Sequence, residues 1–260
     1  CRMEHELFME RCLQLASHGC GHTSPNPMVG SIVVHKGRII GEGWHQQAGK
    51  PHAEVNAINS VKDHGLLPAS ILYVSLEPCA HFGKTPPCSD LIIQHKIPKV
   101  VVATRDPFTE VNGRGIEKLR KAGVEGIEGI LRDKAQELNK RFFTFHTLKR
   151  PYIILKWAQT QDGFLDKLRA GNHEGVNWIT TPATKTLVHQ WRAQEDAILV
   201  GSRTVLNDNP ALTVRDVHGK NPLRLVLDTD LSLKGTEAVF NGDAPTLYLH
   251  GEAPSPSVKA

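Results

Sequence analysis

The stretch 77–88, EPCAHFGKTPPC, together with the tripeptide 52–54, HAE, decides how this chain is to be interpreted. One histidine and two cysteines, His52, Cys79 and Cys88, suit a catalytic zinc site, which uses three protein ligands and leaves the fourth position to water. Glu54 follows His52 by two residues, so its carboxylate can reach that water without binding the metal. The residues therefore predict a zinc centre with Glu54 as its proton carrier.

The order H-x-E, then P-C, then C is the pattern of zinc deaminases that act on nucleobases. The alternative is a disulfide or two ordinary core thiols, but the order, the spacing and Pro78 favour a metal site. Most such deaminases close the cysteine pair to C-x-x-C, whereas residues 80–87 separate Cys79 from Cys88 here. This insertion is polar and carries His81 and Lys84, which predicts a substrate-recognition loop beside the metal.

The composition is that of a globular, water-soluble chain. It has 260 residues, enough for two domains, with 40% hydrophobic and 22% charged residues. No apolar run approaches the length of a membrane span, and the polar N-terminus is not typical of a signal peptide. The five cysteines are an odd number without framework spacing. We therefore expect a cytoplasmic protein.

Charge is distributed unevenly along the chain. Residues 1–150 contain 20 Lys and Arg against 15 Asp and Glu, whereas residues 151–260 contain 11 against 12. The positive balance of the first part suits a small anionic substrate, but it lacks the dense basic stripe of a nucleic-acid surface. We expect no nucleic-acid or membrane partner, and self-association into a homo-oligomer.

The first part of the chain alternates between helical and strand patterns. We expect helices at 5–17, from Pro51, at 88–95, 115–122 and 131–146, and strands at 29–34, 38–43, 71–76 and 100–104. Such alternation is typical of an α/β layer fold. Both metal-binding segments then lie at helix N-termini, where a thiolate is stabilised.

A second pattern begins after a short linker at 149–151. It contains a strand at 152–157, a helix at 182–192, and strands at 197–200, 223–227 and 246–250. We expect two domains, residues 1–148 and residues 149–260.

The motifs extend over nearly the whole chain. They are PNPMVG at 25–30, GWH at 43–45, HAE at 52–54, EPCAHFGKTPPC at 77–88, DP at 106–107 and GRG at 113–115, then WIT at 178–180, RA at 192–193 and the segment 201–215. With these motifs the chain resembles the bifunctional deaminase–reductases of riboflavin biosynthesis. The resemblance implies a cytidine-deaminase-like three-layer α/β/α domain, followed by a partial α/β domain similar to dihydrofolate reductase.

For the first domain the resemblance implies zinc-dependent deamination of 2,5-diamino-6-ribosylamino-4(3H)-pyrimidinone 5′-phosphate, giving 5-amino-6-(5-phosphoribosylamino)uracil. Glu54 would move protons, and His52, Cys79 and Cys88 would bind the metal. The residues that would hold the phosphorylated pyrimidine ribotide are Asn26, His45, His81, Lys84 and Asp106. One departure is Phe108, because the family usually has Asn there.

For the second domain the resemblance implies reduction of the ribosyl group to ribityl with NADPH, although the sequence has no G-x-G-x-x-G after a strand. The residues facing the cofactor would be Ala158, Trp178, Thr204, Asp208 and Thr229. Those facing the substrate would be Lys156, Arg192, Leu212 and Arg215, with Val176 where the family often has Ser. The family's reductase domain continues further and brings a glycine-rich turn, so we expect a complete deaminase and an incomplete reductase.

Three other functions are compatible with parts of this pattern. A zinc deaminase of another base, such as a tRNA adenosine or free guanine, would share the metal ligands, but the long cysteine spacing argues against it. A structural zinc module would need a fourth ligand, for which His81 is the nearby candidate, and would leave Glu54 without a role. A binding protein derived from the enzyme would not need the His52–Glu54 pair.

Overall fold

A computed structural model of the chain describes residues 2–80, 86–108, 111–169 and 175–251. The chain divides into two compact units, Cys1–Ile153 and Ile154–Ala260, and each is described by itself. Within the described ranges, no helix is long and apolar enough to cross a membrane.

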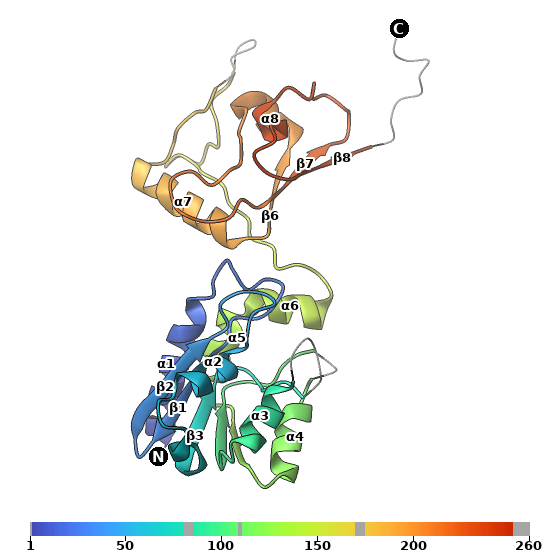
Figure 1. Ribbon diagram of the computed structural model, residues 1–260. Coiled ribbons are helices and arrows are strands. Elements are labelled where there is room, and N and C mark those ends of the chain that lie inside the picture. Colours follow the sequence, from blue (N-terminus) through green and yellow to red (C-terminus); the bar gives the residue numbers. More distant parts are fainter. Residues whose placement is uncertain (1, 81–85, 109–110, 170–174, 252–260) are drawn as a thin grey trace. The chain divides into compact units, whose positions relative to one another are not determined.

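The first unit is built on a five-stranded sheet with the strand order β2-β1-β3-β4-β5 (Figure 1). Strands β1 and β2 form an antiparallel hairpin, and β1 also pairs antiparallel with β3. Strands β3, β4 and β5 are parallel to one another, so their carboxyl ends meet at one edge of the sheet. The five strands are β1 (Gly30–His35), β2 (Arg38–Trp44), β3 (Ser70–Val74), β4 (Lys99–Val102) and β5 (Glu125–Glu128).

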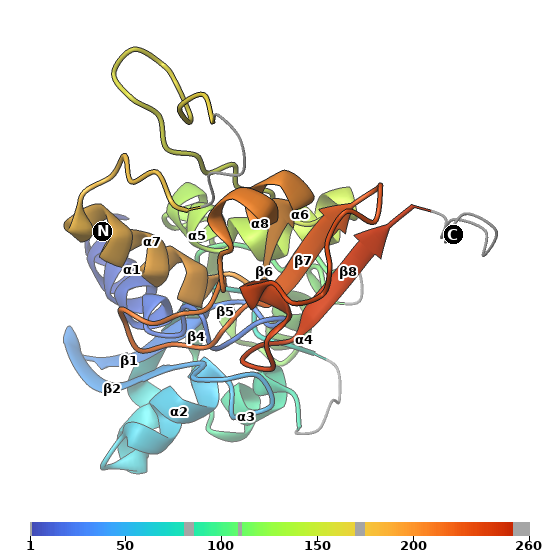
Figure 2. The ribbon, with the colours of Figure 1, turned by 90° about the horizontal axis from the view of Figure 1, so that it is seen from above.

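Helices cover both faces of this sheet. On one face, α2 (Ala53–Ser60), α3 (Cys88–Gln94) and α4 (Arg114–Lys121) contribute Ile58, Ile92 and Leu119 to a buried cluster with Leu72 and Val100. On the other face, α1 (Arg2–Ser17) and α5 (Arg132–Leu138) pack Met9, Cys12 and Ala135 against Tyr73 and Val101. Seen from above, α2 and α3 lie next to each other (Figure 2). Helix α6 (Lys140–Leu148) and a 3-10 turn (His64–Ala69) complete the unit.

The second unit contains three parallel strands in the order β6-β7-β8. They are β6 (Ala197–Gly201), β7 (Leu223–Asp228) and β8 (Thr246–His250), accompanied by α7 (Pro182–Gln194), α8 (Ser202–Asp208) and a 3-10 turn (Ala238–Phe240). On one face of the sheet, Val226 of β7 forms a small buried cluster with Val205, Leu212 and Val239. The other face carries exposed leucines, among them Leu199, Leu227 and Leu247.

The expected α/β/α layering of the first unit is confirmed, but two sequence expectations about elements were wrong, and two elements were missed. A single helix over 131–146 is instead α5 and α6, separated at Asn139, whose side chain bonds to a distant loop. The expected strand 152–157 is unpaired chain, because a strand exists only where its backbone finds a ladder partner. Strand β5 and helix α8 were not expected.

Candidate metal centre

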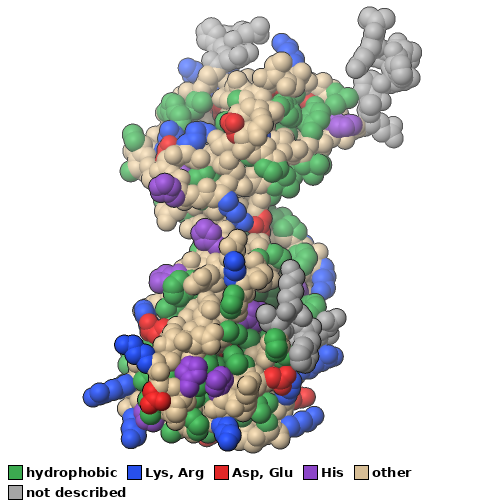
Figure 3. Space-filling view, in the orientation of Figure 1, with side chains coloured by type: hydrophobic (Ala, Val, Ile, Leu, Met, Phe, Trp, Pro, Cys, Tyr) green, Lys and Arg blue, Asp and Glu red, His purple; other side chains and the backbone are tan. Residues whose placement is uncertain are grey.

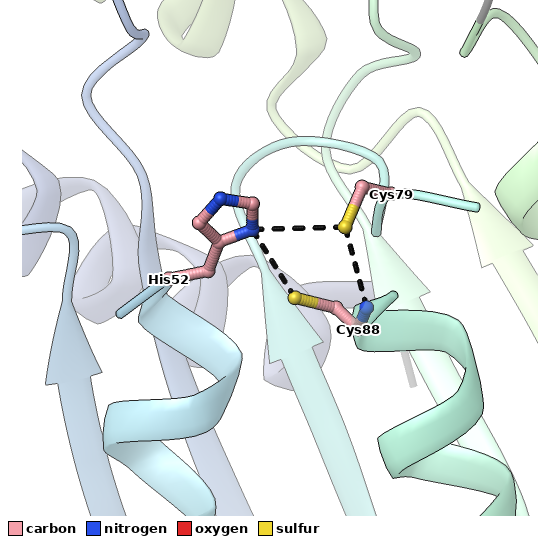
Figure 4. Close-up of side chains that lie close together, drawn as sticks. All are labelled: His52, Cys79 and Cys88. Atoms are coloured by element: carbon pink, nitrogen blue, oxygen red, sulfur yellow. Dashed lines mark hydrogen bonds between the residues drawn. The ribbon is translucent and has the colours of Figure 1, made fainter. Parts of the chain in front are cut away.

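Three side chains from three segments converge beside the carboxyl end of β3 (Figure 4). His52 is the N-cap residue of α2, which begins at Ala53 rather than at Pro51. Cys79 lies in the loop after β3, and Cys88 is the first residue of α3. The backbone N–H of Cys88 donates to Cys79 Sγ over 3.2 Å, so the start of α3 helps to stabilise a thiolate at Cys79.

The distances among the three ligand atoms suit zinc. His52 Nδ1 lies 3.3 Å from Cys88 Sγ and 3.6 Å from Cys79 Sγ, and all three ligand atoms lie within 4.8 Å of one another. Tetrahedral zinc, with Zn–S of about 2.3 Å and Zn–N of about 2.1 Å, separates its N and S ligand atoms by about 3.6 Å. The donor set and its spacing therefore fit one zinc ion without rearrangement.

Protons are shared unequally among these ligands. The hydrogen bond from Cys88 lowers the pKa of Cys79 to about 4, and that with His52 adds to the effect. The neighbouring Cys79 sulfur, followed by burial, raises the pKa of Cys88. The hydrogen bond with Cys79 raises the pKa of His52 to about 9. At neutral pH the protein groups alone thus form an imidazolium, a thiolate and a thiol.

Glu54 lies in the first turn of α2 and is 3% exposed. Burial raises the pKa of its carboxyl group to about 7, against the opposing effect of His52. A carboxyl group with a pKa near the working pH both accepts and returns a proton readily. The position and acidity of Glu54 therefore suit a general acid–base group next to the ligand cluster.

Asn26 and His45 form a second polar pair close to His52. The His45 ring is buried and meets the His52 ring edge-on, with 5.6 Å between centroids. His45 Nδ1 lies 3.1 Å from the Pro51 carbonyl oxygen, which can only accept, so Nδ1 carries the proton. His45 Nε2 then accepts from Asn26 Nδ2 over 3.1 Å. Burial lowers the pKa of His45, so this imidazole is neutral and its orientation is defined.

Asp106 lies beyond the end of β4, and its Oδ1 accepts from the Phe108 backbone N–H over 2.8 Å. The Phe108 ring meets His146 of α6 with 5.2 Å between centroids, so this departure from the family pattern contributes an aromatic contact. The Asp106 backbone is tied to Glu77, a residue for which the sequence alone predicted no role. The predicted substrate residues His81 and Lys84 lie outside the described residues.

In the second unit the structure brings three of the predicted substrate residues together. Arg192 Nη1 donates to the Thr213 carbonyl over 2.7 Å, and Arg215 Nη1 donates to Thr213 Oγ1 over 2.8 Å. Leu212 is buried beside Thr213 and has a positive φ of 55°. Burial, and then the nearby Arg215, lower the pKa of Arg192. Two guanidinium groups at one loop suit an anion.

Arg224 of β7, for which the sequence alone predicted no role, bonds to the segment that precedes Thr213 and to the segment that precedes β8. It is fully buried, and its guanidinium donates to the carbonyls of Ala211, Asn241 and Ala244 and to Asn241 Oδ1. A buried arginine bonded to carbonyl oxygens serves to fix loops, because none of these partners carries a negative charge. The only signal in the sequence was a charged residue at an inward position of an apolar strand.

The remaining predicted reductase residues are spread over several segments. Thr204 and Asp208 share α8, and Asp208 accepts from Arg169 Nη2 over 3.3 Å. Thr229 is exposed directly after β7. Trp178 is 63% exposed with the Lys185 ammonium 5.6 Å from its ring centroid. Lys156 and Ala158 lie in the unpaired chain before α7, and within the described ranges no hydrogen bond joins them to the Thr213 loop.

Two family models match the chain, one in each unit. The model described as "Cytidine and deoxycytidylate deaminase zinc-binding region" matches residues 2–104, which contain His52, Cys79 and Cys88. The "RibD C-terminal domain" matches residues 151–257. The riboflavin biosynthesis protein RibD of Aquifex aeolicus is 46% identical over 93% of this chain and 67% of its own length. The chain belongs to the RibD family.

Solved RibD structures share the fold. The deaminase/reductase of Thermotoga maritima is 43% identical, with a TM-score of 0.85 over 98% of this chain and 73% of that one. RibD of Acinetobacter baumannii is 33% identical, with a TM-score of 0.86 over 97% and 71%. The expected fold class, a cytidine-deaminase-like domain followed by a dihydrofolate-reductase-like α/β domain, is confirmed. The chain spans 67%, 58% and 64% of the lengths of the RibD proteins of Aquifex aeolicus, Actinobacillus pleuropneumoniae and Bacillus amyloliquefaciens.

Proposed function

We propose that the first unit is a zinc-dependent deaminase of riboflavin biosynthesis. Its substrate would be 2,5-diamino-6-ribosylamino-4(3H)-pyrimidinone 5′-phosphate, whose exocyclic amine is replaced by oxygen from water with release of ammonia. The observation that carries the proposal is the His52, Cys79 and Cys88 cluster with Glu54 buried next to it. Membership of the RibD family supplies the substrate class.

The chain's own residues account for the proton movements. His52, Cys79 and Cys88 would hold the zinc ion, which would supply Lewis-acid activation of water. The Glu54 carboxylate takes one proton from the attacking water and delivers it to the ring nitrogen. It then takes the second proton from the hydroxyl group now on the attacked carbon and gives it to the amine, which leaves as ammonia while the carbonyl forms. His45, whose two ring nitrogens bond to Pro51 and Asn26, holds the Asn26 amide in a defined orientation, and we propose that this pair contacts the pyrimidine.

We also propose that the second unit contributes the NADPH-dependent half of the family's chemistry, reduction of ribosyl to ribityl. The match to the RibD C-terminal domain supports this, as does the Thr213 loop with Arg192 and Arg215, which suits the ribotide phosphate. Asp208 and Thr229, at the carboxyl ends of α8 and β7, are the proposed cofactor contacts. Titration with NADPH, followed by its fluorescence, tests this half; unchanged fluorescence at saturating NADPH would count against it.

We further infer a cytoplasmic, self-associating enzyme that does not bind nucleic acid. None of the four described cysteines is in a disulfide, which fits a reducing compartment. On the face of the first unit in Figure 3, Lys and Arg are interspersed with Asp, Glu and His rather than gathered into a stripe. Light scattering on the purified chain tests the self-association.

The deaminase proposal is tested by ammonia release from the ribotide, with zinc content measured on the same sample. We expect one zinc per chain and steady turnover, and we expect Glu54→Gln to keep its zinc while losing turnover. Zinc without turnover on this ribotide would redirect the assignment to another base, or to a structural zinc module.

A further inference from the structure

We propose that Glu77 is a positioning residue for the deaminase, holding Asp106 and the start of α4 in register with the Cys79 ligand. The inference rests on the proposed function of the first unit and adds to it a residue that does not touch the metal ligands or the substrate. Glu77 lies two residues before Cys79, is 4% exposed, and points away from solvent.

The Glu77 carboxylate accepts four backbone hydrogen bonds from two other segments. Its Oε2 accepts from the N–H groups of Asp106, over 3.3 Å, and Gly113, over 2.9 Å. Its Oε1 accepts from those of Gly115, over 3.0 Å, and Ile116, over 3.3 Å. A carboxylate satisfied on both oxygens in this way fixes the position of both segments, because each buried N–H has this oxygen as its partner.

The backbone around Glu77 is equally constrained. Its own N–H donates to the Thr104 carbonyl over 3.0 Å, which joins the loop after β3 to the loop after β4. A Cβ atom at Gly115 would lie 1.9 Å from the Pro78 carbonyl oxygen, so α4 contacts the loop that bears Cys79 directly. Glu77 thus joins the segment bearing a metal ligand to the segment bearing the proposed substrate residue Asp106.

The chemistry of this contact requires a carboxylate. All four partners are donors, and the two at Gly115 and Ile116 belong to the first turn of α4, where the helix dipole favours a negative group. An amide in its place would turn an NH₂ group toward two N–H donors on one side. Either segment would then have to move, so Asp106 would lose its defined place while His52, Cys79 and Cys88 keep theirs.

The test compares Glu77→Gln with wild type in zinc content, steady-state kinetics and backbone amide exchange. We expect unchanged zinc, a KM for the ribotide raised about tenfold, and a kcat within about twofold of wild type. Amide exchange should accelerate at residues 106 and 113–116. Glu117→Gln is the matched control, because Glu117 is an exposed residue in the first turn of α4. Its substitution removes the same charge and leaves the four hydrogen bonds to Glu77 in place.

A double-mutant cycle separates positioning from bulk stability. If Glu77 acts through Asp106, then Glu77→Gln raises KM little further in an Asp106→Asn background. Independent, additive effects would overturn the proposal, as would loss of zinc or an unaltered KM. Should Glu77→Gln not fold, Glu77→Asp, which keeps the charge on a shorter arm, replaces it and faces the same criteria. Wild-type turnover is measured first, because an inactive wild type counts against the deaminase assignment. In that case the amide exchange of Glu77→Gln decides by itself whether Glu77 holds residues 106 and 113–116 in place.

Discussion

The side-chain amide of Asn139 pairs with both backbone groups of Met28, its Oδ1 accepting from the N–H and its Nδ2 donating to the carbonyl, each over 2.8 Å. Asn139 is 3% exposed, and it lies where α5 gives way to α6. Met28 follows the Asn26 turn, whose amide holds His45. The break between two helices is thereby connected to the ring beside the metal site.

Replacing Asn139 by Ala should loosen this connection. We expect the free energy of unfolding to fall by about 2 kcal/mol, because the two backbone groups of half-buried Met28 lose their partner. The KM for the ribotide should rise, since Asn26 and His45 lose their support. Chemical denaturation and steady-state kinetics measure the two effects. Asn139→Asp keeps the acceptor for the Met28 N–H but turns an oxygen toward the Met28 carbonyl, so it should also be less stable than wild type; equal stability of all three proteins would contradict the role.

Zinc binding should release protons and strengthen with rising pH. In the zinc-free protein His52, with its pKa raised to about 9, is protonated at pH 7, and Cys88, with its pKa raised, is a thiol. Cys79, whose pKa is lowered to about 4, is already a thiolate. Because zinc requires a neutral imidazole and two thiolates, binding near pH 7 should release about two protons per ion.

Calorimetric titration of zinc in buffers of different ionisation enthalpy counts these protons. The zinc affinity should also rise by about a hundredfold for each unit of pH in this range. Binding heats independent of the buffer would contradict a protonated His52 and a Cys88 thiol in the zinc-free protein. The same experiment on Cys88→Ser separates the contribution of the thiol from that of His52.

The parts of the fold that the sequence predicts are those whose pattern is local. The apolar runs of β1, β3 and β4 carry their own signal, and so do the candidate metal ligands, whose residue types and order are readable directly. Strand β5, with the sequence EGIE, is a short edge strand, and nothing in four mostly polar residues distinguishes it from a loop.

The parts that could not be predicted depend on distant partners. The helical pattern of 131–146 runs through Asn139 without interruption, and the break there makes sense only through Met28. The apolar segment 152–157 has strand composition but no pairing strand among the described residues. Glu77 is one acidic residue in a motif until the fold brings four N–H groups from residues 106–116 around it.

Gly115→Ala tests the close approach of α4 to the ligand loop. The added Cβ would lie 1.9 Å from the Pro78 carbonyl oxygen, a backbone atom that cannot move by itself. We expect a loss of several kcal/mol in unfolding free energy, or displacement of α4 with a raised KM. Gly126→Ala is the matched control, because its Cβ would meet nothing closer than 3.6 Å. Thermal unfolding and steady-state kinetics compare both variants with wild type. If Gly115→Ala behaves like Gly126→Ala, α4 does not contact the loop that bears Cys79.

Arg224→Met should destabilise the second unit and leave the first unaffected. The substitution removes the donors to three carbonyl oxygens, at a cost of about 2 kcal/mol. Arg203→Met, at an exposed position of α8, is the control. Limited proteolysis should cut the second unit faster in Arg224→Met, while zinc content and ammonia release stay at the wild-type level. Equal cleavage rates in the two variants would show that Arg224 does not hold these loops.

Acid should weaken the second unit through Asp228. Burial by itself would raise the pKa of this carboxyl group, but hydrogen bonds from the Tyr248 hydroxyl, the Leu233 N–H and the Ser232 hydroxyl outweigh burial and lower the pKa to about 2. Because the pKa is lower in the folded than in the unfolded chain, the stabilisation is complete above about pH 4 and is lost as the pH falls toward 2. Tyr248→Phe removes one donor, so the pKa of Asp228 should rise in this variant and its acid unfolding midpoint should move to higher pH. Unfolding of both proteins followed by circular dichroism from pH 5 to pH 2 checks this; coincident acid transitions would mean that the Tyr248 bond does not stabilise the carboxylate.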